Sequence, residues 1–400
     1  MQLVRLSCVY MNWFVVVEDD VSVNNAVHTH VTEFCDALSE YETVTLISYS
    51  KGVSFIDNSK VSTISIKPVS ISPNNIGILL STIKLFFSLL MIHRNNKFDV
   101  LYNRASAFGF GPLLFARLKN IPAIIEINGI WREEQLLSLK SYPIVKRWLV
   151  APIQYLRHLS LVAISRGANK IIAVTPKIAA YLTSLGITAD RITIAPNGVN
   201  TQLFTPKDPS ESKNSLHLNV ELTYIGFIGS LTAWQGVDDL INAFYLIERS
   251  DQVNLLIVGD GIERENLEKL AQRLEINKYV HFLGRKPYRE IPLYLSACDI
   301  LVAPKKPLSS GFSPLKVYEY MACSRPIITS RAEGLEFISE NRIGYLFSPG
   351  DINDLKENII RMLDTGEEKR TAMGVRARQM AEGNYSWDAT VQLIRNSANI

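Results

Sequence analysis

Short runs of apolar residues alternate along the whole chain with longer segments in which apolar residues recur every three or four positions. The short runs predict buried strands, and the segments between them predict helices. Residues 27–38, for example, place Val31 and Phe34 on one face of a helix. Strands and helices that alternate in this way are typical of an α/β fold built on parallel sheets.

The predicted strands form two groups, which are separated by a polar stretch at residues 205–217. That stretch contains two prolines and several serines and lacks apolar periodicity, so it has the composition of a linker. We therefore expect two doubly wound parallel-sheet domains, with ligands in the cleft at the carboxyl ends of their strands. The predicted strands are residues 13–18, 43–48, 61–66, 100–103, 123–127, 170–174 and 191–194 in the first group, and 224–228, 254–258, 280–283, 300–303 and 327–330 in the second.

The composition agrees with a two-domain globular protein in a reducing compartment. The chain has 400 residues, more than one hydrophobic core usually supports, of which 47% are hydrophobic and 20% charged. The cysteines form no CxxC pair and no Cys/His cluster, which indicates neither a zinc site nor a disulfide framework. The cytosol is therefore the expected location. The cysteines are Cys8, Cys35, Cys298 and Cys323.

The net charge of +3 conceals a strongly basic region. Residues 81–180 contain 14 Lys and Arg residues against 4 Asp and Glu residues, interleaved with large apolar side chains. Such a surface suits an anionic membrane or a phosphorylated acceptor, and the alternative is an ordinary solvated face. We expect a peripheral position on the inner face of the membrane. Nucleic acid is not an expected partner, because no nucleic-acid reader motif accompanies the charge.

No segment is expected to span a bilayer. The most apolar run, residues 76–92, is shorter than the roughly 18 residues that a span needs and is interrupted by Lys84, so a packed helix is predicted. The start of the chain lacks the basic, apolar and small-residue pattern of a signal peptide. Met11 lies just before the first predicted strand and is a second candidate start.

Residues 310–328 carry the most specific chemistry of the chain. They predict a loop, then a helix over residues 315–322 with Pro314 in its first turn, then a strand. The amino end of a helix offers free amide groups and a positive dipole, which bind phosphate. Lys316 adds a charge there, and Glu319 can accept two ribose hydroxyl groups. This pattern indicates a nucleotide-sugar site, and the alternative is an amphipathic helix with a solvated Lys–Glu pair.

Three predicted strands of the second half end in glycine turns, at Gly229-Ser230, at Gly259 and at Gly284. Glycine lets backbone amide groups approach a phosphate closely. One glycine after a strand usually marks only a turn. Three in succession, followed by the helix at 315–322, favour a phosphate site.

Longer stretches of the sequence resemble the retaining glycosyltransferases of family 4. They include IGFIGSLTAWQGVDDLINAF, LIVGDGIERENLE and SPLKVYEYMA in the second half and RITIAPNGVNTQLF in the first. The resemblance covers residues 12–395 and implies the GT-B fold, in which two Rossmann-like domains face a cleft. It implies an acceptor-side domain at 1–203, a nucleotide-sugar domain at 204–384, and a helix at 385–400 that returns to the first domain.

The resemblance also implies donor-side roles for the residues that match family motifs. Glu319 matches the glutamate that holds the donor ribose, and Lys316 lies where it would neutralise the diphosphate. The turn at 284–286 would border the base, and Gly229 and Ser230 would meet the diphosphate. The implied donor-binding residues are Gly229, Ser230, Gly259, Gly284, Arg285, Lys286, Gly311, Phe312, Ser313, Pro314, Leu315, Lys316 and Glu319.

By the same resemblance, the first half supplies the acceptor side. The implied acceptor-side residues are Asn25, His30, Glu126, Asn128, Gly129 and Glu133. The candidates for direct participation in transfer are Glu319, Lys316, Glu134 and Asn128. The resemblance implies that the donor phosphate helps to deprotonate the acceptor, so no separate general base is expected. For the carboxylates Glu126, Glu133 and Glu134 the alternative is a charged loop.

Three departures from the family pattern bear on activity. Gly311 stands where many members carry a first glutamate, and the early Gly-Gly turn is replaced by Asn25-Ala26. Ser230 and Gln235 stand where many members carry Arg and Lys. These departures mark either a subfamily or a weakened enzyme. The candidate substitutes for the missing charges are Lys305, Lys306, Lys316 and Arg285.

The expected activity is that of a metal-independent, retaining glycosyltransferase of the hexosyltransferase type. We interpret the acidic run at residues 18–20 as a solvated turn, and no strand end carries an Asp-x-Asp pair. A UDP-sugar is the favoured donor and a GDP-sugar the second, with no further cofactor expected.

The expected acceptor is a saccharide or lipid-linked saccharide in the synthesis of a surface polysaccharide, such as a capsule or lipopolysaccharide, or of a glycolipid. The alternatives are a weakened GT-B binding or scaffold protein and another GT-B enzyme, such as a nucleotide-sugar epimerase or a phosphorylase. The sequence does not specify the donor sugar, the acceptor, the linkage or the oligomeric state.

Overall fold

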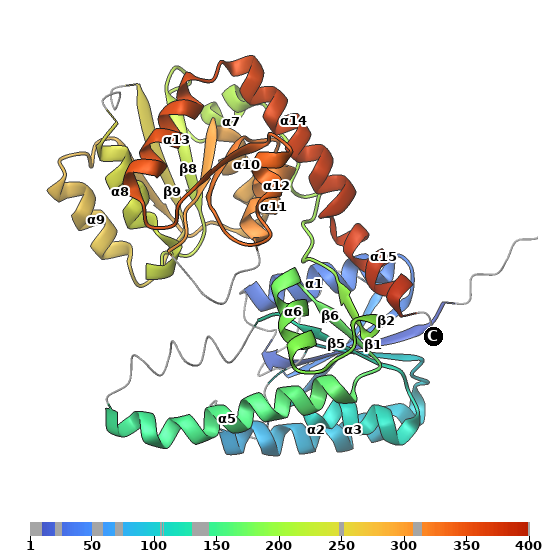
Figure 1. The fold of residues 1–400 in the computed structure, drawn as a ribbon. Coiled ribbons are helices and arrows are strands. Elements are labelled where there is room, and N and C mark those ends of the chain that lie inside the picture. Colours follow the sequence, from blue (N-terminus) through green and yellow to red (C-terminus); the bar gives the residue numbers. More distant parts are fainter. Residues whose placement is uncertain are drawn as a thin grey trace, which may run out of the picture. The chain divides into compact units, whose positions relative to one another are not determined.

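The chain folds into two compact α/β units (Figure 1). The computed structural model describes residues 10–20, 26–49, 59–68, 75–104, 106, 108–129, 144–247, 252–306 and 314–398. One unit contains Met1–Asn197 together with Thr390–Ile400, and the other contains Gly198–Ala389. The first unit is therefore assembled from two separate stretches of the chain.

The first unit is built on seven strands: β1 (Asn12–Asp20), β2 (Thr43–Tyr49), β3 (Val61–Ile66), β4 (Val100–Arg104), β5 (Ala123–Ile127), β6 (Lys170–Ala173) and β7 (Ile192–Ile194). They form a parallel sheet in the order β3-β2-β1-β4-β5-β6-β7. Residues Trp13 to Val17 of β1 are all apolar and buried. Such a continuous apolar run is typical of a central strand that helices cover on both faces.

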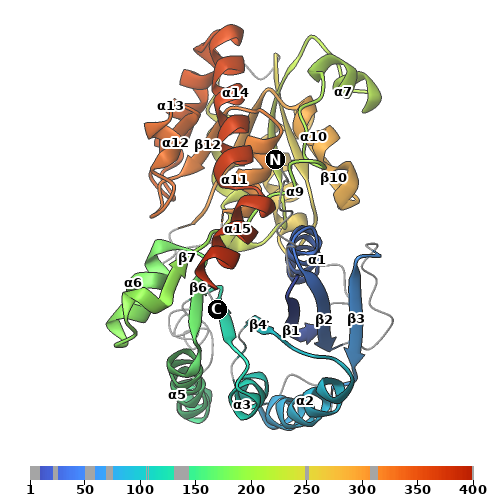
Figure 2. The same cartoon turned by 90° about the vertical axis from the view of Figure 1, so that its right-hand side faces the viewer.

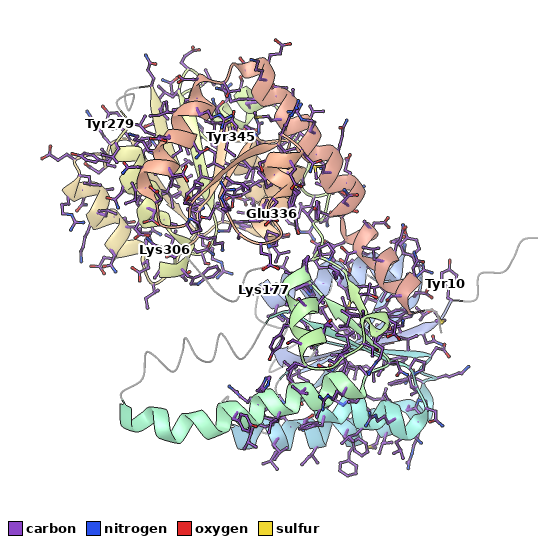
Figure 3. All side chains as sticks on the ribbon, viewed as in Figure 1. Tyr10, Lys177, Tyr279, Lys306, Glu336 and Tyr345 are labelled. Atoms are coloured by element: carbon purple, nitrogen blue, oxygen red, sulfur yellow. The ribbon has the colours of Figure 1, made fainter. Side chains whose placement is uncertain are left out.

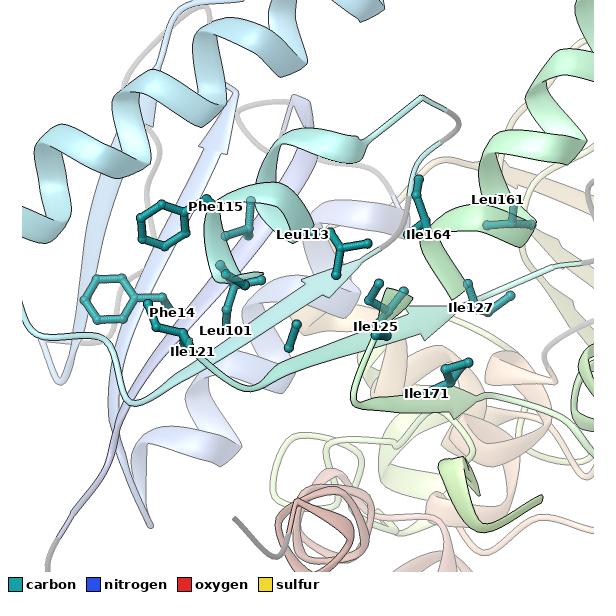
Figure 4. Close-up of a cluster of buried hydrophobic side chains, with 14 of the residues drawn as sticks. Phe14, Leu101, Leu113, Phe115, Ile121, Ile125, Ile127, Leu161, Ile164 and Ile171 are labelled. Carbon is teal, nitrogen blue, oxygen red and sulfur yellow. The ribbon is translucent and has the colours of Figure 1, made fainter. Parts of the chain in front are cut away.

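Helices cover both faces of this sheet (Figure 2). α2, α3, α5 and α6 bury one apolar cluster, which includes Phe14 of β1, Leu113 of α3 and Ile164 of α5 (Figure 4). On the opposite face, Phe34 of α1 stacks on Tyr102 of β4 with ring centroids 4.6 Å apart. The helices are α1 (Ala26–Ser39), α2 (Asn75–Asn95), α3 (Phe110–Lys119), α5 (Ile144–Gly167), α6 (Pro176–Ser184), and the part of α15 (Trp387–Ser397) that begins at Thr390, with the 3-10 turn η1 (Ala189–Arg191).

The second unit is built on six strands: β8 (Thr223–Ile228), β9 (Val253–Val258), β10 (Val280–Gly284), β11 (Ile300–Ala303), β12 (Ile327–Ser330) and β13 (Gly344–Phe347). They form a parallel sheet in the order β10-β9-β8-β11-β12-β13. Leu256 and Leu301 belong to one apolar cluster, whereas Leu255 and Ile300 belong to another. Since neighbouring residues of a strand point to opposite faces, the two clusters fill the two faces of this sheet.

The helices of the second unit are α7 (Pro209–Ser215), α8 (Val237–Tyr245), α9 (Arg264–Arg273), α10 (Ile291–Ala297), α11 (Leu315–Ala322), α12 (Phe337–Glu340), α13 (Ile352–Asp364) and α14 (Glu367–Asn384), with the 3-10 turns η2 (Ala233–Gln235) and η3 (Tyr288–Glu290). In this unit, α8 to α12 connect successive strands from β8 to β13, whereas α7 precedes β8 and both α13 and α14 follow β13. The predicted fold class is confirmed, and every predicted strand is present with bounds that differ by at most two residues. β13 was not predicted.

The prediction of a linker at residues 205–217 was wrong in part, because α7 forms inside it. The carboxylate of Asp208 accepts a hydrogen bond of 2.8 Å from the amide of Glu211 and so caps the helix. Pro209 occupies the first turn, where its missing amide costs no hydrogen bond. Lys213 is buried, and its ammonium group donates to the carbonyl of Leu222 over 2.9 Å. Polar contacts therefore fix a helix that apolar periodicity does not reveal.

The apolar run at residues 76–92 lies within α2 and packs on the sheet, as predicted. Leu85 and Leu89 belong to the core of the first unit. By length and composition alone, one helix among the described residues is sufficient to cross a membrane: Gly77–Asn95, with a mean hydropathy of 1.4. About a quarter of that segment is buried inside the protein.

Candidate active site

A buried polar group lies in the first unit near the carboxyl ends of β4 and β5. Glu126, near the end of β5, is 3% exposed, and His30 of α1 is 6% exposed. His30 Nε2 lies 2.9 Å from Oδ1 of Asn197 and 3.4 Å from Oε1 of Glu126. Segments separated by more than 60 residues therefore meet in one cluster, at the edge of the sheet where doubly wound folds bind ligands.

Several donors hold Glu126 in place as a carboxylate. The Tyr102 hydroxyl and the Asn128 side-chain amide donate hydrogen bonds to its oxygens, and Nε of Arg104 lies 3.7 Å from Oε1. Burial raises the pKa of Glu126, but the charge that His30 carries when protonated, the charge of Arg104 and these hydrogen bonds hold that pKa below its ordinary value. Burial lowers the pKa of His30. At neutral pH we therefore take Glu126 as ionised and His30 as neutral, with Arg104 as the permanent counter-charge.

This arrangement suits a positioning role for Glu126 and a contact role for His30. A buried carboxylate with this many partners exchanges protons poorly, but it fixes the imidazole beside it. Nε2 of His30 faces two acceptor oxygens and therefore carries the proton of the neutral ring, so Nδ1 can accept a hydrogen bond from a hydroxyl group. Asn128 and Gly129 follow β5 and are partly exposed.

The structure thus brings together His30, Glu126 and Asn128 of the predicted acceptor-side residues. Asn25, Glu133 and Glu134 lie outside the described residues. The sequence analysis missed Tyr102, Arg104 and Asn197 as members of this group. Polar residues at the end of a buried strand and before the Asn197-Gly198 turn were the available signal, but only the tertiary fold joins them.

In the second unit, the predicted glycine turns lie side by side at the carboxyl ends of β8, β9 and β10. The amide of Gly229 donates to the carbonyl of Val258 over 2.9 Å, and the amide of Gly259 donates to the carbonyl of Gly284 over 2.9 Å. Gly259 has a φ of +141°, and a Cβ atom there would collide with the carbonyl oxygen of Gly229. Glycine is therefore required where these two turns meet.

Two lysines converge on one amide beside the first of these turns. Oε1 of Gln235 accepts hydrogen bonds from Nζ of Lys305 over 2.9 Å and from Nζ of Lys316 over 2.8 Å. Nε2 of the same Gln235 donates to the Ser230 hydroxyl over 3.3 Å. A Cβ atom on Gly229 would come within 2.5 Å of Nζ of Lys316, so this ammonium group lies directly over the turn.

The surroundings of both lysines favour their neutral forms until an anion arrives. Burial lowers the pKa of Lys305 to about 6, and the charge of Lys316 adds to this effect. Burial lowers the pKa of Lys316 to about 7, although Glu319 opposes the change. Nζ of Lys305 lies 3.9 Å from the ring centroid of Trp234, and aromatic faces favour the charged form of such groups. The pair is therefore set to gain protons when a phosphate binds.

α11 has the predicted bounds and carries Lys316 and Glu319 on successive turns. Glu319 is partly buried. Pro314 is the N-cap residue and not, as predicted, part of the first turn; its carbonyl accepts the amides of Val317 and Tyr318. Leu315 is the first residue of the helix. Gly311, Phe312 and Ser313 lie outside the described residues.

Arg285 and Lys286 are the remaining predicted donor residues, and Lys306 is a candidate substitute for a missing family charge. Arg285 and Lys286 directly follow Gly284, and Nζ of Lys286 lies 5.6 Å from the ring centroid of Tyr294. Lys306, labelled in Figure 3, forms ion pairs with Asp238 at 2.9 Å and with Asp239 at 2.5 Å. Of the candidate substitutes for the missing family charges, Lys305 and Lys316 thus join the glycine turns, whereas Lys306 is neutralised elsewhere. Among the described residues, no group of three or more His, Cys, Asp or Glu side chains could hold a metal ion.

Two parallel doubly wound sheets, with glycine turns and lysines at the edge of one sheet, define a two-domain α/β protein whose second unit has a site suited to phosphate. The profile described as Glycosyltransferase Family 4 matches residues 27–203, and that described as Glycosyl transferases group 1 matches residues 208–380. The chain belongs to this family of glycosyltransferases and has the GT-B fold.

Curated relatives agree with this assignment over part of their length. A glycosyltransferase of Methanocaldococcus jannaschii is 32% identical over 170 residues, 42% of this chain and 46% of the relative. A GDP-mannose-dependent monoacylated phosphatidylinositol monomannoside mannosyltransferase of Corynebacterium glutamicum is 29% identical over 209 residues, 50% of this chain and 54% of the relative. The matched segment therefore spans about half the length of these relatives.

Solved structures match almost the whole chain in fold. Anabaena HepE, solved in complex with UDP, has a TM-score of 0.74 at 17% identity and covers 97% of this chain and 99% of its own. Sucrose-phosphate synthase from Thermosynechococcus elongatus has a TM-score of 0.77 at 19% identity, covering 96% and 98% respectively. At these identities the likeness concerns the fold.

Proposed function

We propose that this protein is a retaining glycosyltransferase that moves a hexosyl group from a nucleotide-diphosphate sugar to a saccharide or lipid-linked saccharide. The observation that carries the proposal is the convergence of Lys305 and Lys316 on Gln235, over the Gly229 turn and one helical turn from Glu319. A diphosphate needs cations and amides where this group lies, and a ribose needs a carboxylate close by. The family of the chain supplies the reaction class.

In the proposed reaction, the lysines stabilise the negative charge that develops on the departing diphosphate. Preorganised cations of this kind act on a transition state without a metal ion. They would also replace the Arg and Lys that are absent at Ser230 and Gln235, since Gln235 acts as their anchor. Glu319 would accept the ribose hydroxyls, and the donor phosphate would receive the proton of the attacking acceptor hydroxyl.

On the acceptor side, the proposal gives His30 a hydrogen bond to the substrate and Glu126 the task of fixing His30. The distances of 2.9 and 3.4 Å around Nε2 of His30 support this division of roles. Asn128 and Gly129 would border the same substrate. Glu134 and Glu133 stay predictions of the resemblance.

A UDP-sugar is the favoured donor, because Anabaena HepE was solved in complex with UDP and with UDP-glucose. A GDP-sugar is second, because the relative from C. glutamicum is described as GDP-mannose-dependent. Synthesis of a surface polysaccharide or glycolipid, at the cytoplasmic face of a membrane, completes the proposal. The lipopolysaccharide outer core galactosyltransferase WaaB shares the fold, with a TM-score of 0.64.

A binding or scaffold protein without turnover is the second candidate, and the loss of the family charges at Ser230 and Gln235 favours it. The two functions differ in the fate of the donor once it has bound. An active transferase hydrolyses its donor slowly when no acceptor is present, whereas a scaffold releases it unchanged.

The test is a thermal-shift screen against UDP, GDP, ADP, CMP and their common sugars, each with and without EDTA. We expect one nucleotide to raise the melting temperature equally in both conditions. Glu319→Ala should abolish most of that shift and leave the melting temperature of the free protein unchanged, because the side chain is only partly buried. Glu357→Ala, an exposed glutamate on α13, is the matched control. Undiminished nucleotide binding by Glu319→Ala would refute the site.

A further inference from the structure

Large apolar side chains are exposed on three neighbouring helices of the first unit. Ten of the nineteen exposed large apolar residues among the described positions belong to α2, α3 and α5. Phe87 is 59% exposed and Met91 is 68% exposed. We call this surface the three-helix face; its apolar members are Leu79, Leu80, Ile83, Phe87, Met91, Leu114, Leu118, Tyr155, Leu156 and Leu159.

These side chains follow the helices as stripes. On α2 they recur every four residues from Leu79 to Met91, while Leu85 and Leu89 point into the core. Leu114 and Leu118 repeat the four-residue spacing on α3. Figures 1 and 2 show α5, α3 and α2 side by side on one face of the seven-stranded sheet, with α3 in the middle. The stripes therefore lie on one outer layer.

The charges on the same three helices have one sign. Together the helices carry eight Lys and Arg residues and no Asp or Glu residue. Lys84, Arg94, Arg117 and Lys119 are exposed among or beside the apolar stripes. The basic residues are Lys84, Arg94, Arg117, Lys119, Lys146, Arg147, Arg157 and Arg166.

We propose that the three-helix face docks the protein on an anionic phospholipid bilayer. The helices would lie in the plane of the interface, with the stripes in the acyl boundary and the basic side chains at the headgroup phosphates. An ordinary solvated face would not gather large apolar side chains in rows. A second copy of the same face would bring like charges together, so three helices that carry only basic charged residues favour an anionic partner.

The packing of α2 on the sheet determines the orientation in which this helix would contact the bilayer. Its length and hydropathy suffice for a transmembrane helix, but Leu85 and Leu89 attach it to the sheet. A helix held in that way presents one side to the lipid and lies flat on it. This inference rests on the proposed function only for its purpose, which is to bring a lipid-linked acceptor to the enzyme; its test requires no sugar transfer.

The experiment measures binding of the full chain to sedimented vesicles of phosphatidylcholine, with and without phosphatidylglycerol. We expect binding to the anionic vesicles that weakens with salt. Phe87→Ser/Met91→Ser should weaken it roughly tenfold or more, and Arg94→Gln/Lys119→Gln roughly tenfold at low salt. Ile262→Ser, at an 84% exposed position of the second unit, is the matched apolar control and should bind like the wild type.

A second measurement separates insertion from charge attraction alone. Tryptophan placed by Phe87→Trp should be quenched by phospholipids brominated in the acyl chain, beyond the quenching of the wild type. The absence of both vesicle binding and quenching would overturn the proposal.

A wild-type dimer in light scattering, made monomeric by Phe87→Ser/Met91→Ser without any vesicle binding, would assign the face to a second copy of the chain. Melting temperatures and nucleotide-induced shifts of all variants should match those of the wild type. A missing nucleotide shift with intact vesicle binding would refute the proposed function and leave the docking surface standing.

Discussion

Replacing Lys316 by methionine should make the free protein more stable and its nucleotide binding weaker. Methionine keeps the unbranched stem that packs over Phe227 and Gly229 but removes the ammonium group. A pKa lowered from 10.5 to about 7 means that the folded state disfavours the charged lysine. At pH 7.5 this difference destabilises the folded protein by about 4 kcal/mol, since each pKa unit corresponds to about 1.4 kcal/mol.

The measured gain will be smaller than that value for two reasons. Lys316 is only partly buried, and the substitution removes the hydrogen bond from Nζ to Gln235, which contributes about 1 kcal/mol. We therefore expect the free energy of unfolding to rise by about 1–3 kcal/mol in urea titrations at pH 7.5. The sign follows because a lysine with a lowered pKa costs stability below the pKa of the unfolded chain, so its removal restores stability.

The same substitution should weaken binding of UDP, or of whichever nucleotide diphosphate the screen identifies. Loss of one charge-assisted hydrogen bond corresponds to about 1.5–3 kcal/mol, or roughly a 10- to 150-fold rise in Kd by calorimetry. Lys306→Met is the matched control: it should lower stability, because it leaves the buried Asp239 without its ion pair, and should leave Kd unchanged. A destabilised Lys316→Met protein with unchanged Kd would refute the reasoning.

Three further outcomes are expected. Nucleotide affinity should fall as the pH rises from about 6 to about 8, because binding takes up protons on lysines whose pKa values in the free protein are about 6 and about 7; calorimetry in buffers of different ionisation enthalpy would detect the uptake. Gly259→Ala should lower the melting temperature by several degrees and abolish the nucleotide shift, whereas Gly366→Ala, with open space around it, should do neither. Glu126→Gln should lower the pKa of His30 further in an NMR titration, because it removes the carboxylate that raises it. An unchanged or higher pKa would contradict the coupling of these two side chains.

The strands were predictable because a strand of a parallel sheet is buried on both faces and therefore consists of a short run of apolar residues. β11 (Ile300–Ala303) is an uninterrupted buried run of this kind, and its bounds match those predicted from the sequence. α7 was missed because an Asp208 cap and the buried Lys213 determine it, and neither leaves a periodic signal. The pattern of apolar residues thus fails to predict elements that polar contacts stabilise.

The candidate site was predictable to different degrees in the two units. The glycine turns and α11 are local features, and the structure has them where the sequence places them. The role of Gln235 was not foreseen: it looks like a lost charge in the sequence, yet it accepts hydrogen bonds from two lysines that come from other segments. The bond between His30 and Asn197 joins residues 167 positions apart, so only the folded chain reveals it.

The first unit contains residues from both ends of the chain, so it cannot be completed in the order in which the chain is synthesised. Thr390 and Arg395 of α15 bond to Pro196 at 2.8 Å and to Glu42 at 2.7 Å, while Val391 and Ile394 are buried. A ribosome delivers these residues only after the whole second unit. Until then the nascent first unit lacks one of its covering helices and must remain incompletely packed. The second unit, which is continuous, can fold first, and the part of the protein that is made earliest is finished last.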